Sequence, residues 1–130
     1  MTDKKIMIVD DNKEFLDELK EFLFLCGYDV VAVSSSLNAF KAAQMLKPDA
    51  ILLDLKMGEK NGFSVAQDLK KSLTTSHIPI IAMSGHFPIE KKSILLDMSN
   101  MSGQIKKPFA ISDLITQLEK VLGEPKMVPV

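Results

Sequence analysis

The sequence predicts an α/β fold in which a five-stranded parallel sheet is wound on both sides by helices. Five short apolar runs alternate with five segments whose apolar residues recur at helical spacing. The runs are continuously apolar, which is typical of parallel strands that are covered on both faces. Parallel neighbours need crossover helices, and these crossovers are right-handed. The sequence therefore indicates a doubly wound α/β domain.

Length and composition indicate a single domain. The chain has 130 residues, of which 46% are hydrophobic and 25% charged, enough for one core and too few for two. The formal net charge is -1 and neither sign gathers in a long block, so we expect no direct nucleic-acid binding. The start, MTDKK, has no apolar signal region, and no apolar run approaches the roughly 20 residues that span a bilayer. We therefore expect a cytoplasmic protein without membrane contact.

Each expected element has local boundary signals. Strands are expected at residues 5–9, 28–33, 50–53, 78–83 and 104–106. In the first helix, Asp11 or Asn12 is available as the N-cap and Gly27 as the stop with positive φ. Pro48 ends the second helix, and Ser112 is expected to cap the last one. The apolar stripe of the first helix consists of Phe15, Leu16, Leu19, Phe22 and Leu23.

Two further expectations concern the fourth helix and the single thiol. Pro88 suits the first turn of a helix that runs to about Ser99. Cys26 lies in an apolar helical stretch, where a buried structural thiol is the usual state. As the single cysteine, it excludes an internal disulfide.

Polar side chains follow four of the expected strands: Asp10 and Asp11 the first, Asp54 the third, Ser84 the fourth and Lys107 the fifth. The carboxyl ends of parallel strands meet at one edge, where open α/β sheets bind ligands. Taken singly, these residues have ordinary roles as caps, turn formers or surface charges. Together they crowd three carboxylates into one pocket, which calls for a compensating cation.

The expected cation is Mg²⁺, which prefers oxygen ligands and keeps several waters, so two carboxylates and a backbone carbonyl suffice. A cation beside a carboxylate, a hydroxyl and an ammonium is also what phosphoryl transfer requires. In this interpretation Asp54 is the nucleophile, and Lys107 pairs with the phosphoryl oxygens. Ser84 donates a hydrogen bond to one of those oxygens.

These residues resemble the receiver domain of two-component response regulators, over residues 5 to about 122. The resemblance rests on four motifs: Asp10-Asp11, the aspartate loop with Asp54, Met57 and Gly62, Ser84-Gly85, and Lys107-Pro108-Phe109. It implies a flavodoxin-like fold with strand order 2-1-3-4-5. It also implies phosphorylation of Asp54 by a histidine kinase or a histidine phosphotransfer protein.

The resemblance further implies how the chain is divided and how it holds metal. Mg²⁺ is expected on Asp11, Asp54 and the backbone carbonyl of Lys56, with Asp10 acting through water. Residues 1–123 are expected to form the receiver domain, and 124–130 a C-terminal tail or the start of a linker. A stand-alone receiver and a receiver excised from a longer chain both remain open. The output protein or domain is unknown.

Three features depart from the family pattern or vary within it. Gly58 stands where the family usually has proline, which leaves the loop with a less restricted backbone. Gln104 stands where an aromatic switch residue is common, so we expect its side chain to stay solvent-facing. Lys56 and His86 stand at positions flanking the pocket where the family varies its dephosphorylation rate, and a role as ordinary surface residues is an equal alternative.

Two other functions compete with the signalling receiver. A small aspartyl-phosphate phosphatase or phosphotransferase on the same fold needs a second acid/base and a substrate lid, for which 130 residues leave little room. An unphosphorylated interaction module has no reason to retain buried charges. We therefore expect a receiver that catalyses only its own phosphorylation and dephosphorylation and is not a metabolic enzyme.

Overall fold

Five parallel strands form one sheet. The structure is a computed structural model and describes residues 4–85 and 101–123. The strands are β1 (Lys5–Val9), β2 (Asp29–Val33), β3 (Ala50–Asp54), β4 (Ile80–Ser84) and β5 (Gly103–Lys106). Their order is β2-β1-β3-β4-β5, and every neighbouring pair is parallel. The expected fold class and strand order are confirmed.

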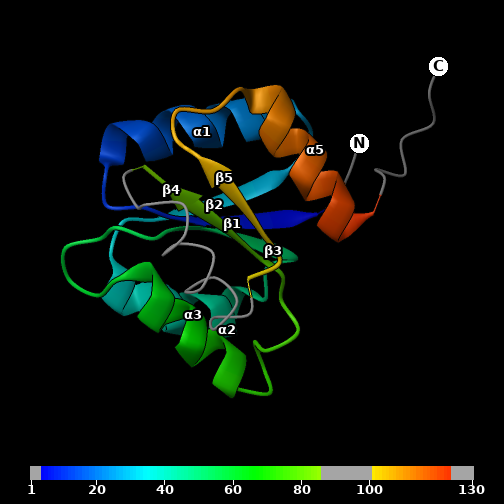
Figure 1. Cartoon of the computed structure of the whole chain (residues 1–130). Helices are drawn as coiled ribbons and strands as arrows, with labels where there is room; N and C mark the ends of the chain where they lie inside the picture. Colours follow the sequence, from blue (N-terminus) through cyan, green and yellow to red (C-terminus); the bar gives the residue numbers. More distant parts are fainter. Residues whose placement is uncertain (1–3, 86–100, 124–130) are drawn as a thin grey trace.

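Helices cover both faces of the sheet. They are α1 (Lys13–Leu25), α2 (Ala39–Leu46), α3 (Gly62–Lys71) and α5 (Ile111–Leu122), with a short 3-10 helix η1 (Ser36–Asn38) before α2. Helices α1 and α5 lie on one face and α2 and α3 on the other (Figure 1). The helix expected from Pro88 to about Ser99 lies outside the described residues.

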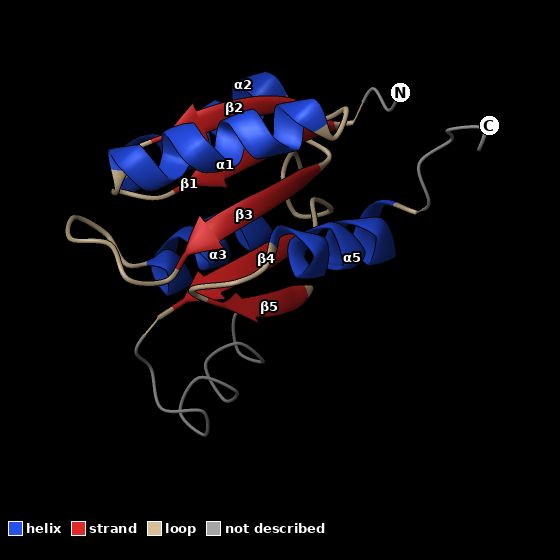
Figure 2. Cartoon of the chain, turned by 90° about the horizontal axis from the view of Figure 1, so that it is seen from above, coloured by secondary structure: helices blue, strands red, loops and turns tan. Residues whose placement is uncertain are grey.

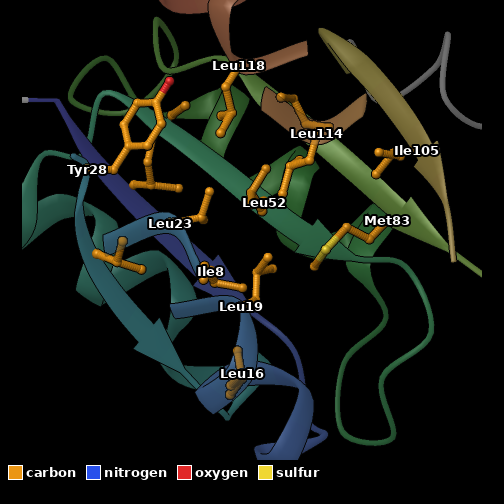
Figure 3. Close-up of a cluster of buried hydrophobic side chains, with 14 residues drawn as sticks. Ile8, Leu16, Leu19, Leu23, Tyr28, Leu52, Met83, Ile105, Leu114 and Leu118 are labelled. Carbon is orange, nitrogen blue, oxygen red and sulfur yellow. The ribbon is translucent and has the colours of Figure 1, made fainter. Parts of the chain in front are cut away.

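The sheet separates two apolar cores, which explains why its strands are continuously apolar. Along β1, Ile6 and Ile8 belong to the core under α1 and α5, whereas Met7 and Val9 belong to the core under α2 and α3. Figure 3 shows the first core, where Leu52 of β3 lies among leucines of α1 and α5. Each large side chain buried in this way contributes roughly 1.5–3 kcal/mol. The cores hold the central strands, and so the strand ends, in fixed positions.

The helix boundaries only partly follow the expected signals. Asn12, not Asp11, caps α1, because its side chain accepts a hydrogen bond from the Phe15 N–H at 3.1 Å. Gly27 has the expected positive φ, 95°. The expectation for Ser112 is wrong: Ala110 is the N-cap of α5 and makes no side-chain capping hydrogen bond.

Two observations concern the surface. Cys26 is exposed, contrary to expectation, because it is the C-cap residue of α1 and lies beyond Leu23, the last buried leucine of that helix. Within residues 4–85 and 101–123, no helix is long and apolar enough to cross a bilayer.

The loop after β3 folds back tightly onto the end of its own strand. The Gly62 N–H donates to the Leu55 carbonyl at 3.1 Å. A Cβ at position 62 would meet the Asp54 carbonyl oxygen and would lie 2.8 Å from the Leu55 Cα. These are backbone atoms and cannot rotate away, so position 62 requires glycine. At Gly58, in the same loop, a Cβ would have nothing within 4 Å.

This contrast gives a matched pair of variants. We expect Gly62→Ala to lower the free energy of unfolding by about 1–3 kcal/mol, because the backbone beside Asp54 must move. Gly58→Ala should change it by less than about 1 kcal/mol, since the space is open. Urea denaturation of both variants measures the difference. Equal stabilities would contradict the proposed close approach at Gly62.

Candidate functional site

Strand ends bring the chemically active side chains to one edge of the sheet. Asp10 directly follows β1, Asp54 ends β3, Ser84 ends β4, and Lys107 directly follows β5. Because the strands are parallel, these ends point the same way (Figure 2). The structure therefore gathers at one edge residues that lie up to 97 positions apart in sequence.

Three carboxylates form the centre of this edge. One oxygen from each of Asp10, Asp11 and Asp54 lies within 4.8 Å of the others. Asp10 is 1% exposed and Asp54 is 5% exposed, whereas Asp11 is exposed. Two of the three negative charges are thus largely removed from water, where their mutual repulsion is poorly screened.

Lys107 supplies the opposite charge. Its Nζ lies 2.5 Å from Asp10 Oδ2 and 3.8 Å from Asp54 Oδ1. The Lys107 backbone N–H donates to the Ser84 carbonyl at 2.6 Å, which ties the lysine to the end of β4. The Lys107–Pro108 peptide bond is cis. Among the described residues, Lys107 provides the salt bridges to this cluster, so three carboxylates face one ammonium.

This imbalance shows in the acidity of Asp54. Burial, followed by repulsion from Asp10 and more weakly from Asp11, raises the pKa of the Asp54 carboxyl from 3.8 to about 6. The Lys107 ammonium and the Lys56 N–H, which donates to Asp54 Oδ1 at 3.2 Å, oppose this rise in pKa. Burial and repulsion thus outweigh the Lys107 ammonium and the Lys56 N–H at Asp54, and a cation bound beside this carboxylate would lower its pKa.

A pocket opens beside Asp54. Its volume is about 440 Å³, and it is lined by Phe15, Asp54, Lys56, Gly85, Lys107 and Pro108. Ser84, next to Gly85, is 1% exposed and ends β4. The pocket is large enough for a phosphoryl group to approach Asp54. His86 lies outside the described residues.

The family model for the response regulator receiver domain matches residues 6–119. The chain belongs to this family. It is thus a receiver domain of two-component signal transduction, and the alternative of a phosphatase enzyme is not favoured. Receiver domains are signalling domains rather than conventional enzymes.

Two curated relatives differ in length. The chain is 28% identical over 121 residues to the polar-differentiation response regulator DivK of Brucella ovis, covering 93% of this chain and 98% of DivK. It is 28% identical over 125 residues to the DNA-binding dual master transcriptional regulator RpaA of Synechocystis, covering 96% of this chain. Since it spans 52% of RpaA, it matches about half the length of that relative.

Solved structures share the fold. The chemotaxis protein CheY4 of Vibrio cholerae superposes with a TM-score of 0.86 at 25% identity, covering 92% of this chain and 99% of CheY4. The receiver domain of the sensor histidine kinase PA1611 of Pseudomonas aeruginosa gives 0.85 at 24% identity, covering 94% and 99%. That second structure has a magnesium ion coordinated in its active-site cleft.

In this receiver the loop that carries Gly58 is tethered. The Gly58 N–H donates to Asp11 Oδ2 at 3.4 Å, a bond that proline could not make. Ser35 Oγ donates to Glu59 at 3.0 Å, and the Lys60 N–H donates to Ser36 Oγ at 2.9 Å. The freedom expected from glycine is therefore opposed by three hydrogen bonds.

The switch position is polar and open to solvent. The Gln104 side chain is exposed, as expected, and the backbone carbonyl oxygen of Gln104 accepts a 2.5 Å hydrogen bond from Gln117 Nε2. Because Gln104 has no ring to bury, we expect the change on phosphorylation to be carried mainly by the loop from Ser84 to Pro88, most of which lies outside the described residues. This expectation stays a prediction.

Sequence reasoning missed one residue of the site. The helical spacing places Phe15 in the apolar stripe of the first helix, but its ring centroid lies 4.2 Å from Lys107 Nζ. The ring also meets Phe109 edge-on, with centroids 6.0 Å apart and planes at 88°. An apolar residue in the first turn of a helix carries no signal that separates a core position from a contact with a charged group. Only the tertiary structure reveals it.

The raised pKa of Asp54 makes a pH-dependent prediction for stability without divalent metal. Because the folded pKa, about 6, exceeds the ordinary value of 3.8, ionisation of Asp54 destabilises the fold, fully above pH 6 and not at all below the ordinary value. Asp54→Asn should therefore be more stable than the native chain at pH 7–8, by up to about 3 kcal/mol. The gain should vanish towards pH 3–4.

Denaturant unfolding in chelator at fixed ionic strength measures this difference. Asp17→Asn, which removes an exposed carboxylate from α1, is the matched control. A stability difference for Asp54→Asn that stays constant from pH 4 to pH 8 would contradict the account.

Proposed function

We propose that Asp54 is the residue that accepts the phosphoryl group in this receiver domain, from a phosphohistidine of a histidine kinase or a histidine phosphotransfer protein. The observation that carries the proposal is the position of its carboxylate. It is 5% exposed at the end of β3, lines the pocket, and has the Lys107 ammonium 3.8 Å away. Receiver domains interact with kinases or phosphotransfer proteins and with output domains.

The transfer is a single displacement at phosphorus. A carboxylate oxygen of Asp54 forms the new P–O bond while the P–N bond to the donor imidazole breaks, and the bonding electrons remain on the departing nitrogen. The product is an acyl phosphate on Asp54. We assign to Lys107 the role of pairing with the phosphoryl oxygens, and to Ser84 the donation of a hydrogen bond to one of them. Hydrolysis of the acyl phosphate would return the carboxylate, so the domain would catalyse its own phosphorylation and dephosphorylation.

Receiver domains bind Mg²⁺ at an acidic pocket, and the residues of this chain fit that ion. Three carboxylate oxygens within 4.8 Å, opposed by one ammonium, form a hard, oxygen-rich and negatively charged donor set. When bound, the metal neutralises charge on the phosphoryl oxygens and on Asp54. We assign Asp11, Asp54 and the Lys56 carbonyl as direct ligands.

Asp10 is expected to act through water, and its hydrogen bonds support this role. Its Oδ2 is paired with Lys107, and its Oδ1 accepts from the Asn12 N–H at 2.9 Å. Asp11 is exposed, and within the part of the chain that the structure describes its carboxylate accepts one long hydrogen bond, from the Gly58 N–H at 3.4 Å. A metal can therefore reach Asp11 at little cost, whereas direct ligation by Asp10 would disrupt its ion pair.

The wider role concerns what the receiver controls. We propose that phosphorylation changes its affinity for an output protein or a linked output domain. DivK matches this chain over nearly its whole length, whereas RpaA is about twice as long, so both arrangements exist among relatives. Residues 1–123 would be the receiver unit, with 124–130 as a tail or the start of a linker. The cytoplasmic location stays a prediction.

The phosphorylation site is tested with a small donor. Incubation with acetyl phosphate and Mg²⁺ should add one labile phosphoryl group, detected by intact mass spectrometry. Asp54→Asn should abolish the addition, because its amide is not a nucleophile. Asp49→Asn, at the other end of β3, is the matched control and should label normally. Labelling of Asp54→Asn to the native extent would show that the assignment is wrong.

The ligand assignment predicts unequal effects at the paired acids. We expect Asp11→Ala to weaken Mg²⁺ binding about tenfold or more, and Asp10→Ala to weaken it less, since only Asp11 is assigned as a direct ligand. Titration followed by calorimetry or by amide chemical shifts measures both affinities. Equal losses, or a larger loss for Asp10→Ala, would contradict the assignment.

A further inference from the structure

The aromatic ring of Phe15 lies against the active-site ammonium. Its centroid is 4.2 Å from Lys107 Nζ, within the range at which a ring face attracts a cation. Phe15 is partly buried and also lines the pocket beside Asp54. Lys107 therefore contacts carboxylates and the face of an aromatic ring.

A series of contacts that starts and ends at Lys107 fixes the position of the Phe15 side chain. Lys107 pairs with Asp10, and Asp10 Oδ1 accepts from the Asn12 N–H. Asn12 Oδ1 in turn accepts from the Phe15 N–H at 3.1 Å, and the Phe15 ring returns to Lys107. The helix cap thus holds the backbone that carries the ring.

A second aromatic residue supports the ring from the side. Phe109 packs edge-on against Phe15, at 6.0 Å and 88°, a favoured geometry for aromatic pairs. Phe109 is two residues from Lys107, so the segment that carries the ammonium also carries the support for its aromatic neighbour. Helix α1 and the segment after β5 are joined at this point.

We propose that Phe15 is a positioning residue for phosphoryl transfer, which holds the Lys107 ammonium over the pocket through a cation–π contact. The inference rests on the proposed role of Asp54 as acceptor. A lysine side chain has many rotamers, and ordering it at the moment of transfer costs entropy. The ring restricts those rotamers beforehand and keeps water from one side of the ammonium, which strengthens its attraction for phosphoryl oxygens.

Four proteins test the proposal: the native chain, Phe15→Leu, Phe15→Tyr and Phe22→Leu. Phe15→Leu keeps an apolar side chain but removes the ring face, and Phe15→Tyr keeps the face. Phe22→Leu makes the same chemical change on α1 at a residue that is 53% exposed. Acetyl phosphate is the donor, because a small molecule does not report on docking of a protein partner.

We expect Phe15→Leu to lower the labelling rate about three- to tenfold, which lies within the range expected for loss of a cation–π contact. Phe15→Tyr should restore most of the rate, and Phe22→Leu should match the native chain. The Mg²⁺ concentration that gives half the maximal rate should be the same in all four, since no metal ligand is altered. A general distortion of the pocket would shift this concentration as well.

Replacing Phe15 with ring-fluorinated phenylalanines removes negative charge from the ring face at nearly constant shape. The rate should fall progressively with the number of fluorines. A native rate in Phe15→Leu, or rates that ignore fluorination, would overturn the inference. Failure of the native chain itself to label would instead overturn the proposed function, so the two failures are distinguishable.

Discussion

The main electrostatic constraint on this structure is the repulsion among three carboxylates, which the fold brings together at one edge of its sheet. Asp10 and Asp54 leave water when the central strands are buried, yet Lys107 supplies the one ammonium that pairs with them among the described residues. Burial and repulsion raise the pKa of Asp54 to about 6. The apolar cores on either side of the sheet offset this cost, and the proposed Mg²⁺ would supply the positive charge that the three carboxylates lack.

The fold and the site were largely predictable because their signals are local. Continuously apolar runs such as residues 6–9 arise when a strand is buried on both faces, and the two cores of β1 confirm that reading. A parallel sheet then brings the residues after each strand to one edge without any knowledge of tertiary contacts. The strand order cannot be predicted from periodicity in the same way. Only the resemblance to the receiver family implies the order 2-1-3-4-5.

For three residues the sequence predicts the wrong environment or role, because contacts and exposure are not encoded in local sequence patterns. Phe15 matches the helical apolar stripe, but its ring faces Lys107, which lies 92 positions later in the chain. Cys26 has an apolar neighbourhood in sequence and is exposed because its helix ends there. Ser112 is a good capping residue, but α5 begins one residue before it, at Ile111. In each case, the position of a helix end or a tertiary contact overrides the local propensity of the residue.

The most direct test of the central claim is the effect of Mg²⁺ on folding stability at pH 7–8, with sodium chloride replaced by magnesium chloride at constant ionic strength. If crowded carboxylates make the cation site, the free energy of unfolding should rise with the logarithm of Mg²⁺ concentration above its dissociation constant, with the slope of one bound ion. Stability that is the same in magnesium and in sodium would contradict the claim.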